Sequence, residues 1–270
     1  MVDTDRIKLA VVGATGRMGG TIVREAPADR FEIVGAVAAE GEPGVGRSLR
    51  ELGLTDSDIR VVPPKSLADV LDRSDVCISF TSAAAELANL PTVVAAGRPL
   101  VLGTTGFNES QESWVVDSIT GRIPVVMTSN FSVGANFLFA MASSLKNLPP
   151  SFDTSILEMH HSGKADAPSG TAKTLGRIVS ESRGYSKTVN GRSGISKRTP
   201  EELEIVSLRG GGMPGEHTVF AFGPHETLKL EHVALSRSTF SQGALLAAEW
   251  ISRARESKVY SMLDVLGFRH

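Results

Sequence analysis

The 270-residue chain has little cysteine, no long apolar run and almost no net charge, and each shortage narrows what the protein can be. A single cysteine, Cys77, excludes an internal disulfide framework and a multi-cysteine metal cage, and it suits a reducing compartment. No run of about 18 apolar residues predicts a membrane span, and the opening MVDTDRIKLAVVG is not typical of a signal peptide. We therefore expect a cytoplasmic protein.

The charge balance also bears on the partners. Lys and Arg number 28 against 30 Asp and Glu, which gives a formal net charge of −2. Such a chain has no basic surplus to neutralise a nucleic acid or an anionic membrane, so we expect a small-molecule partner instead. With 41% hydrophobic and 21% charged residues, the chain has the composition of a globular protein, and its length predicts two domains.

The first half alternates short, nearly continuous apolar runs with helical stretches. The predicted strands are Lys8–Val12, Phe31–Val37, Val61–Val62, Val76–Phe80, Pro99–Leu102 and Pro124–Met127. The predicted helices are Arg17–Glu25, Leu67–Leu71 with Ser66 as its N-cap, and Ala84–Ala96. This alternation predicts an α/β fold with a Rossmann-like, doubly wound parallel sheet covered on both faces.

The second half has longer strands and fewer helices. The predicted strands are Thr154–His160, Leu203–Leu208, Thr218–Phe222 and Thr227–Leu235, the last two joined by a hairpin at residues 223–226. The predicted helices are Val133–Leu145, Ser169–Ser182 and Gln242–Arg255, and Tyr185–Ser196 is interpreted as a mobile loop. We expect a second α+β domain with an open mixed or antiparallel sheet that carries helices on one face. Its other face is typical of an oligomer interface.

A glycine-rich turn follows the first predicted strand and opens the first predicted helix. Gly13, Gly16 and Gly19 occur with GxxGxxG spacing, slightly different from the commoner GxGxxG. Glycines in this place permit a sharp turn and let backbone N–H groups approach a pyrophosphate at the helix N-terminus. A glycine triplet by itself also occurs in ordinary turns, but the strand–turn–helix context favours dinucleotide binding.

The residue that would distinguish NAD from NADP is left open. An acid after the second strand often binds the adenosine ribose, and Glu40 is the candidate, although it lies one residue further along than usual. A solvated loop acid is the alternative reading of Glu40, and Arg17 or Arg47 could instead meet a 2′-phosphate.

Two further segments come at the carboxyl ends of predicted strands, Gly103–Gly106 and Ser129–Ser132. Ligands of open α/β sheets bind at these ends, so both segments are expected to converge on one cleft and to face the nicotinamide half of the cofactor. Ordinary turn chemistry is the alternative for each segment taken alone.

The densest group of reactive side chains lies in Glu158–Thr171. It holds two of the six histidines, His160 and His161, together with Lys164 and a Ser-Gly-Thr sequence at a predicted helix start. The helix N-terminus favours an anion such as a carboxylate, and the histidines and lysine supply transferable protons. A zinc site is disfavoured because no cysteine, third histidine or spaced acid nearby completes a tetrahedral set, and a ligand from a distant part of the sequence stays open. Cys77, within an apolar strand, is interpreted as a packed thiol, which argues against a thioester-forming semialdehyde dehydrogenase.

These motifs together resemble the 4-hydroxy-tetrahydrodipicolinate (dihydrodipicolinate) reductase family from Val11 to about Trp250. The resemblance rests on VVGATGRMGG, VLGTTGF, SNFSVGAN, EMHHSGKADAPSGTA, RGGGMPGEHTV and SRSTFSQGA. The segment Glu158–Ala172 is the most specific, because a generic dinucleotide-binding protein does not need it. The resemblance implies an NADH- or NADPH-dependent oxidoreductase that acts on a CH or CH2 group in the diaminopimelate and lysine pathway. It also implies loss of water from the 4-hydroxy substrate and reduction of a conjugated double bond by hydride from the nicotinamide C4.

The same resemblance assigns residues and domains. His160 is the implied general acid/base and Lys164 the implied proton donor, while His161, Ser169, Gly170 and Thr171 are the implied substrate-binding residues. The implied dinucleotide-binding residues are Gly13, Ala14, Thr15, Gly16, Arg17, Met18, Gly103, Thr104, Thr105, Thr128, Ser129, Asn130 and Phe131. The implied dinucleotide-binding domain is 1–130 plus 241–270, and the implied substrate-binding and oligomerisation domain is 131–240, which forms a homotetramer through its sheet.

The chain departs from the family at two places. The family's acid after the second strand aligns best with Ala39, so Glu40 is the candidate in its place, and Ser162-Gly163 stands where bulkier residues are common. Two other functions stay open. A semialdehyde or dicarboxylate reductase would share the cofactor site but reduce a linear substrate faster, and a dinucleotide sensor would bind the cofactor and reduce nothing.

Overall fold

The structure, a computed structural model, describes residues 6–268 and divides into two compact units. Unit 1 comprises the chain up to Phe131 and from Phe240 onward, and unit 2 comprises Ser132–Thr239. Residues 1–5 and 269–270 lie outside the described residues. They are the two ends of the predicted first domain, and residues 1–5 also belong to the N-terminal stretch MVDTDRIKLAVVG. Among residues 6–268, no helix is both long enough and apolar enough to cross a membrane.

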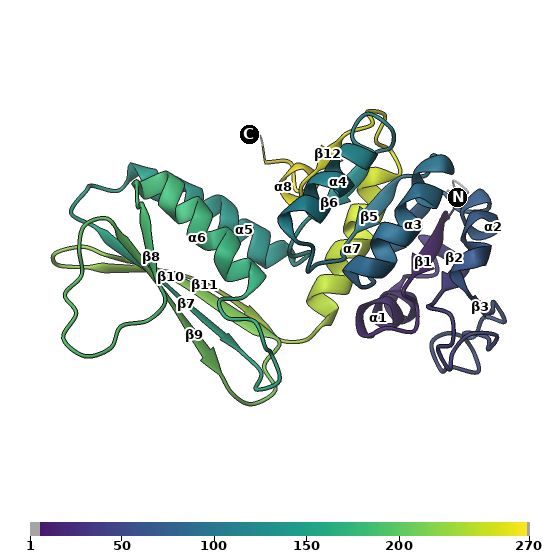
Figure 1. The fold of residues 1–270 in the computed structure, drawn as a ribbon, viewed down its shortest axis with the longest axis horizontal. Coiled ribbons are helices and arrows are strands. Elements are labelled where there is room, and N and C mark those ends of the chain that lie inside the picture. The colour runs from purple at the N-terminus through teal and green to yellow at the C-terminus, as the bar shows by residue number, and fades with distance from the viewer. Residues whose placement is uncertain (1–5, 269–270) are drawn as a thin grey trace. The chain divides into compact units, whose positions relative to one another are not determined.

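Unit 1 is built on a seven-stranded sheet whose neighbouring strands all run parallel (Figure 1). The strand order is β12-β6-β5-β4-β1-β2-β3. The strands are β1 (Ile7–Val12), β2 (Phe31–Val37), β3 (Val61–Val62), β4 (Val76–Ser79), β5 (Leu100–Leu102), β6 (Val125–Met127) and β12 (Val259–Tyr260). The predicted doubly wound parallel sheet is confirmed.

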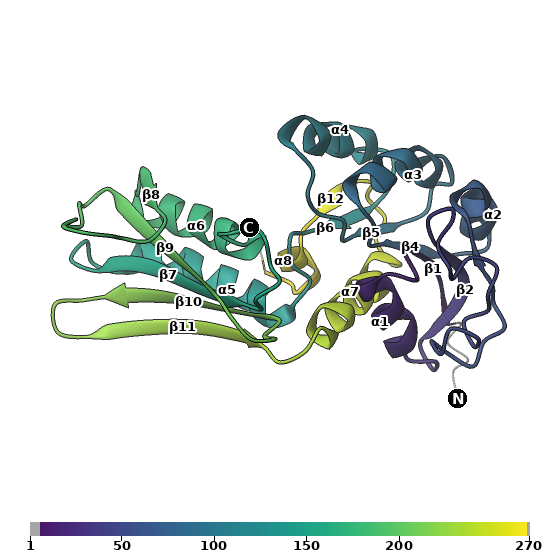
Figure 2. The ribbon, with the colours of Figure 1, turned by 60° about the horizontal axis from the view of Figure 1, so that its bottom comes forward.

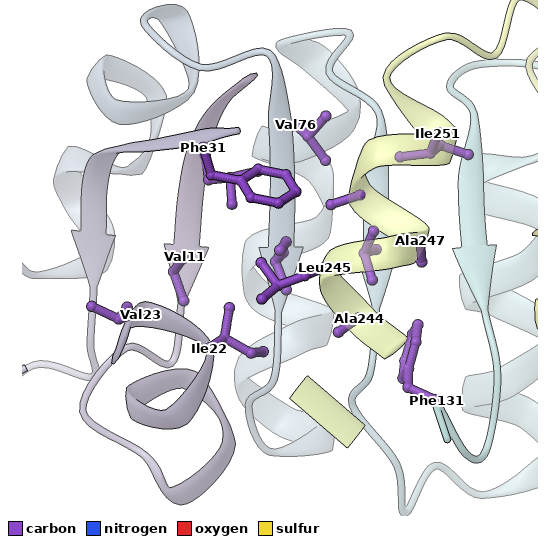
Figure 3. Close-up of a cluster of buried hydrophobic side chains, with 14 of the residues drawn as sticks. Val11, Ile22, Val23, Phe31, Val76, Phe131, Ala244, Leu245, Ala247 and Ile251 are labelled. Atoms are coloured by element: carbon purple, nitrogen blue, oxygen red, sulfur yellow. The ribbon is translucent and has the colours of Figure 1, made fainter. Parts of the chain in front are cut away.

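Helices cover both faces of this sheet because its strands are apolar on both sides. Along β1, Leu9 and Val11 belong to one buried cluster, while Ala10 and Val12 belong to another. The helices are α1 (Arg17–Glu25), α2 (Leu67–Asp72) after the short 3-10 turn η1 (Pro64–Ser66), α3 (Ala83–Ala95), α4 (Glu109–Ile119), α7 (Ser238–Ile251) and α8 (Met262–Val265). Figure 2 shows α2, α3 and α4 on one face and α1 and α7 on the other. Figure 3 shows side chains of α1 and α7 packing on the sheet.

Unit 2 is a five-stranded mixed sheet with its helices on one face (Figure 1). Its strand order is β11-β10-β7-β9-β8. The strands are β7 (Asp153–His160), β8 (Lys187–Val189), β9 (Glu202–Arg209), β10 (Gly215–Phe222) and β11 (Thr227–Ala234). The helical segments are α5 (Val133–Ser143), the 3-10 turn η2 (Ser144–Asn147) and α6 (Gly170–Arg183). Side chains of α5 and α6 bury the apolar face of β7, β9 and β10, which confirms the predicted second domain with an open mixed sheet.

Several predicted elements are wrong in detail. The helix α4 was not predicted, although an Asn108–Gln111 capping box starts it. The predicted last helix to Arg255 ends at Ile251, and β12 and α8 follow it. The predicted mobile loop Tyr185–Ser196 contains β8, which pairs with β9. Ser66 ends a 3-10 turn and makes no side-chain cap bond within the described part of the chain.

Candidate active site

The glycine-rich turn after β1 in unit 1 has the backbone geometry that its sequence predicts. Gly13 has a φ of 84°, and the N–H groups of Gly13 and Ala14 donate to the Val37 carbonyl at 2.8 and 3.0 Å. A Cβ on Gly19 would lie 2.1 Å from the Gly13 carbonyl oxygen. The turn therefore needs glycine at both positions, because α1 passes this close to the end of β1.

The N-terminus of α1 is open to an anion. Gly16 is the N-cap, and among the described residues no side chain caps the helix and no acid lies in its first turn. Arg17 and Gly16 are exposed there, while Thr15 and Met18 are half-buried. Uncapped first-turn N–H groups carry partial positive charge, so this cradle fits the pyrophosphate of a dinucleotide.

Phe80, directly after β4, packs against three of the predicted cofactor segments. A Cβ on Gly13 would lie 2.2 Å from the Phe80 carbonyl oxygen, and a Cβ on Gly103 would lie 2.1 Å from the Phe80 ring. The Phe80 ring also packs against the Phe131 ring, with a centroid distance of 5.5 Å. The structure thus brings the turn after β1, Gly103 after β5 and Phe131 after β6 together at the carboxyl edge of the sheet.

A buried carboxylate beneath this edge was missed by sequence reasoning. Glu86 is fully buried on α3, and its Oε2 accepts hydrogen bonds from Ser79, Thr81 and Thr104 at 2.5, 2.9 and 2.7 Å. Thr104 Oγ1 also accepts the N–H of Thr81 at 2.9 Å. The Thr104 side chain therefore points into the protein, and only its backbone remains to serve the predicted cofactor role.

The other predicted cofactor residues lie at the same edge. Thr128 Oγ1 donates to the Asn130 carbonyl at 3.1 Å and accepts the Asn130 N–H at 3.2 Å, which fixes the turn after β6. Asn130 and Phe131 are buried, whereas Thr105 and Ser129 are exposed. The turn after β6 is therefore held by hydrogen bonds at its base and is accessible at Ser129, while the segment after β5 is accessible at Thr105.

The loop after β2 carries the residues considered for the adenosine ribose. Glu40 is exposed in the turn that follows β2. Arg47 is also exposed, but its guanidinium donates to the Glu51 carbonyl at 2.7 Å. Gly44 packs against Thr15, since a Cβ there would lie 2.6 Å from the Thr15 methyl group. The loop thus adjoins the glycine-rich turn, and both Glu40 and Arg17 are exposed to solvent.

The second candidate cluster lies in unit 2, at the end of β7. His160 and Glu158 are buried on the helix-covered face of the strand, and His160 Nδ1 lies 2.5 Å from Glu158 Oε2. Burial is the strongest influence on the His160 imidazole and lowers its pKa, while the Glu158 carboxylate acts in the opposite direction. His161 comes after the strand has ended and is half-buried.

Lys164 lies in the loop between β7 and α6, together with its acidic neighbour. Lys164 Nζ donates to Asp166 Oδ1 at 2.6 Å, and the Lys164 side chain is 22% exposed. Burial would raise the pKa of Asp166, but the hydrogen bond and positive charge of Lys164 lower it overall. Lys164 is therefore a paired cation that solvent still reaches.

The start of α6 is capped as its sequence predicts. Ser169 Oγ accepts the N–H of Ala172 at 3.2 Å and lies 3.2 Å from His217 Nε2. Ser169 and Thr171 are buried, while Gly170 is exposed and a Cβ there would meet no described heavy atom within 4 Å. The Ser169 hydroxyl is thus occupied by the cap, and open space for an anion lies at Gly170.

The structure adds His217, a residue distant in the sequence, to this cluster, which the sequence reasoning had left open. One ligand atom from each of Glu158, His160 and His217 lies within 4.8 Å of the others. However, Arg209 binds both oxygens of Glu158, at 2.8 and 2.9 Å, and already balances its charge. The set therefore does not fit a divalent cation, which would have to displace an arginine.

Cys77 is fully buried in β4, and burial raises the pKa of its thiol. Its interpretation as a packed apolar group is confirmed.

Comparisons with known proteins agree over nearly the whole chain. The family described as "Dihydrodipicolinate reductase, N-terminus" matches residues 7–131, and "Dihydrodipicolinate reductase, C-terminus" matches residues 134–266. A 4-hydroxy-tetrahydrodipicolinate reductase of Methanopyrus kandleri is 39% identical over 96% of each chain. Another from Citrifermentans bemidjiense is 38% identical over 97% of this chain and 100% of its own.

Solved structures share the fold. The dipicolinate-bound dihydrodipicolinate reductase of Paenisporosarcina sp. TG-14 is similar with a TM-score of 0.71 and 21% identity, over 96% of this chain and 98% of its own. An amine dehydrogenase of Mycobacterium smegmatis is similar with a TM-score of 0.59 and 14% identity, over 94% of each chain. Since proteins with different names share this architecture, the fold alone does not select a substrate.

Proposed function

The chain belongs to the dihydrodipicolinate reductase family, and on this premise we propose that it reduces 4-hydroxy-tetrahydrodipicolinate to tetrahydrodipicolinate with NADH or NADPH. This reaction would place it in the diaminopimelate and lysine pathway. One observation in the structure carries the proposal beyond the family name. Unit 2 gathers a histidine, a lysine and an accessible helix N-terminus between the end of β7 and the start of α6, which suits an anionic substrate that must accept a proton.

The proposed substrate carries two carboxylates, and unit 2 offers positive potential for them. The exposed Gly170 opens α6, whose N-terminus carries partial positive charge. We assign the carboxylates to the backbone of Gly170 and Thr171 and to the side chain of His161. Ser169 supports this site by capping the helix rather than through a free hydroxyl.

The proposed chemistry divides between the two units. The turn after β1 and the carboxyl edge of the sheet in unit 1 would hold a reduced dinucleotide, which would supply a hydride when bound. Hydride addition to a conjugated cyclic imine, formed as the 4-hydroxy group leaves as water, puts negative charge on the resulting enamine. Lys164, an ammonium with three N–H donors, delivers the neutralising proton, and His160 serves as the general acid/base beside it.

The test is oxidation of NADH and NADPH by the wild-type protein with the cyclic substrate generated in place from pyruvate and aspartate semialdehyde by its synthase. We expect oxidation that depends on the synthase, and the ratio of the two rates will report whether the loop around Glu40 accepts a ribose or a 2′-phosphate. Faster oxidation with aspartate semialdehyde or a linear dicarboxylate would favour another reductase. Tight cofactor binding without oxidation of any substrate would favour a dinucleotide sensor.

Two variants test the residue roles. We expect His160→Gln to lower kcat by about 10²- to 10⁴-fold, the usual contribution of a placed acid/base group, with a small change in KM. Lys164→Ala should impair both kcat and KM, since the ammonium would attract the anionic substrate and protonate it. Turnover like that of the wild type in both variants would remove the assignment.

We further propose that the open face of the unit 2 sheet joins copies of the chain into a homotetramer. The strand register places Leu157, Val206, Leu208 and Phe220 on the face away from α5 and α6. Leu208 is 47% exposed, and such apolar surface on a sheet is typical of protein contacts. Light scattering after size exclusion should give four times the chain mass, and Leu208→Glu should reduce it, whereas a monomeric wild type would overturn the proposal.

A further inference from the structure

Three strands of unit 2 bring charged and titratable side chains onto one buried face. Glu158 and His160 are two residues apart on β7 and therefore point to the same side of the sheet. Arg209 on β9 is in register with His160, and His217 on β10 is in register with Glu158. The four side chains consequently meet beneath α6, although they are separated by up to 59 positions in the sequence.

Glu158 is the centre of this network and is fully buried. Its Oε1 accepts Arg209 Nη2 at 2.8 Å and the Ser169 N–H at 3.2 Å, and its Oε2 accepts Arg209 Nη1 at 2.9 Å. Burial would raise the pKa of Glu158, but these charged hydrogen bonds, with those from Ser207 and His160, lower it to about 2. Glu158 is thus a fixed anion throughout the neutral range.

A fixed carboxylate determines which nitrogen of His160 carries the proton. An ionised carboxylate only accepts hydrogen bonds, so His160 Nδ1, at 2.5 Å from Glu158 Oε2, must be the protonated nitrogen. The neutral ring then exposes its lone pair at Nε2. Gly215 lies on that side, where a Cβ would come within 2.8 Å of Nε2, so the glycine leaves room at the reactive nitrogen.

Arg209 extends the same network to the loop that carries Lys164. Besides Glu158, Arg209 Nη2 donates to the Asp166 carbonyl at 2.6 Å, and the Asp166 carboxylate accepts Lys164 Nζ at 2.6 Å. One guanidinium therefore fixes the anion behind His160 and the backbone beside Lys164.

We propose that Glu158 and Arg209 are positioning residues of the reaction: Glu158 holds His160 in the Nδ1-protonated form with Nε2 free, and Arg209 holds Glu158 and the Lys164 loop. This inference rests on the proposed function, because it acts through His160. The charged and titratable groups facing His160 are Glu158 from β7, Arg209 from β9, His217 from β10 and Lys164 from the loop. Of these, only Glu158 raises the His160 pKa.

The test is Glu158→Gln. An amide can turn its NH2 toward Nδ1 and favour the wrong tautomer, so we expect kcat to fall by about 10- to 100-fold, as when the orienting partner of a functional histidine is lost. KM for the reduced dinucleotide should not change. The inflection that His160→Gln removes from the pH profile of kcat should move to lower pH, because the raising influence of the carboxylate is gone.

The matched control is Glu202→Gln. Glu202 is also a buried carboxylate held by cations, Lys187 and Arg192, both at 2.7 Å, but it lies at the other end of β9. The same loss of an ion pair at this distance should leave kcat and its pH profile unchanged. Where Glu158→Gln does not fold, Arg209→Lys keeps the charge without the two parallel bonds and should show a smaller effect of the same kind.

A double-variant cycle separates positioning from general damage. If Glu158 acts through His160, Glu158→Gln should lower kcat in the wild-type background and change little in the His160→Gln background. Equal losses in both backgrounds, or an equal loss in Glu202→Gln, would overturn the inference while leaving the proposed function standing. A wild type that does not reduce the cyclic substrate would instead remove the proposed function itself.

Discussion

Replacing His217 by glutamine should make the protein less sensitive to acid. His217 is 3% exposed on β10, and burial, aided by the nearby charge of His160, lowers its pKa from 6.5 to about 3. A histidine whose folded pKa lies below its unfolded pKa contributes full stability above the unfolded value and loses it as the pH falls toward the folded value. The lost stability therefore appears between pH 6.5 and about 3.

The size of this effect follows from proton linkage. As the pH falls from about 7 to about 5, the unfolded chain comes to bind nearly one proton at this histidine that the folded chain does not bind, and this lowers the free energy of unfolding by ~2 kcal/mol. Glutamine does not titrate and can keep a hydrogen bond to Ser169 Oγ, which lies 3.2 Å from His217 Nε2. The free energy of unfolding of His217→Gln should therefore not fall by this ~2 kcal/mol between about pH 7 and about pH 5.

The assay is urea unfolding at both pH values, followed by circular dichroism. The free energy of unfolding of the wild type should fall by ~2 kcal/mol more than that of His217→Gln. His225→Gln is the matched control, because His225 is exposed in the β10–β11 hairpin and should behave like the wild type. The same loss in the wild type and in His217→Gln would refute the reasoning.

Three further predictions concern other positions. Gly19→Ala should weaken NADH binding by roughly tenfold or more in a fluorescence titration, because its Cβ would overlap the Gly13 carbonyl. Gly20→Ala is the control and should bind NADH normally, because its Cβ would lie 3.4 Å from its nearest neighbour. Gly215→Ala should lower kcat by roughly tenfold or more without changing NADH binding, because its Cβ would displace the His160 ring. Cys77 should resist alkylation, read by mass spectrometry, until the protein unfolds, since it is 0% exposed; modification of the folded protein would contradict its burial.

The sequence predicted the sheet of unit 1 because its strands are nearly continuous apolar runs between helices. It did not reveal α4, since only Val115 and Ile119 of that helix are buried and the apolar periodicity is weak. The strands β8 and β12 have three and two residues, too few for an alternating pattern. The Asn108–Gln111 capping box was the local signal that could have located α4.

The candidate site also contains residues that the sequence predicted and residues that it did not. Local motifs predicted the turn at Gly13 and the cap at Ser169, because turns and caps depend on neighbours within a few residues. Arg209 and His217 join His160 only through the pairing of β7 with β9 and β10, which no local motif encodes. Glu86 was missed for a related reason, since an acid within a helix is usually solvated, and its hydroxyl partners come from β4 and from loops.

Hydride transfer from a reduced nicotinamide to the cyclic imine is the activity that we propose for this chain. The most direct measurement uses NADH deuterated at the transferred position of C4, with the product examined by mass spectrometry. The proposed function predicts that one deuterium enters tetrahydrodipicolinate for each NADH oxidised. NADH oxidation without deuterium in this product, or no oxidation in the presence of the cyclic substrate, would contradict it.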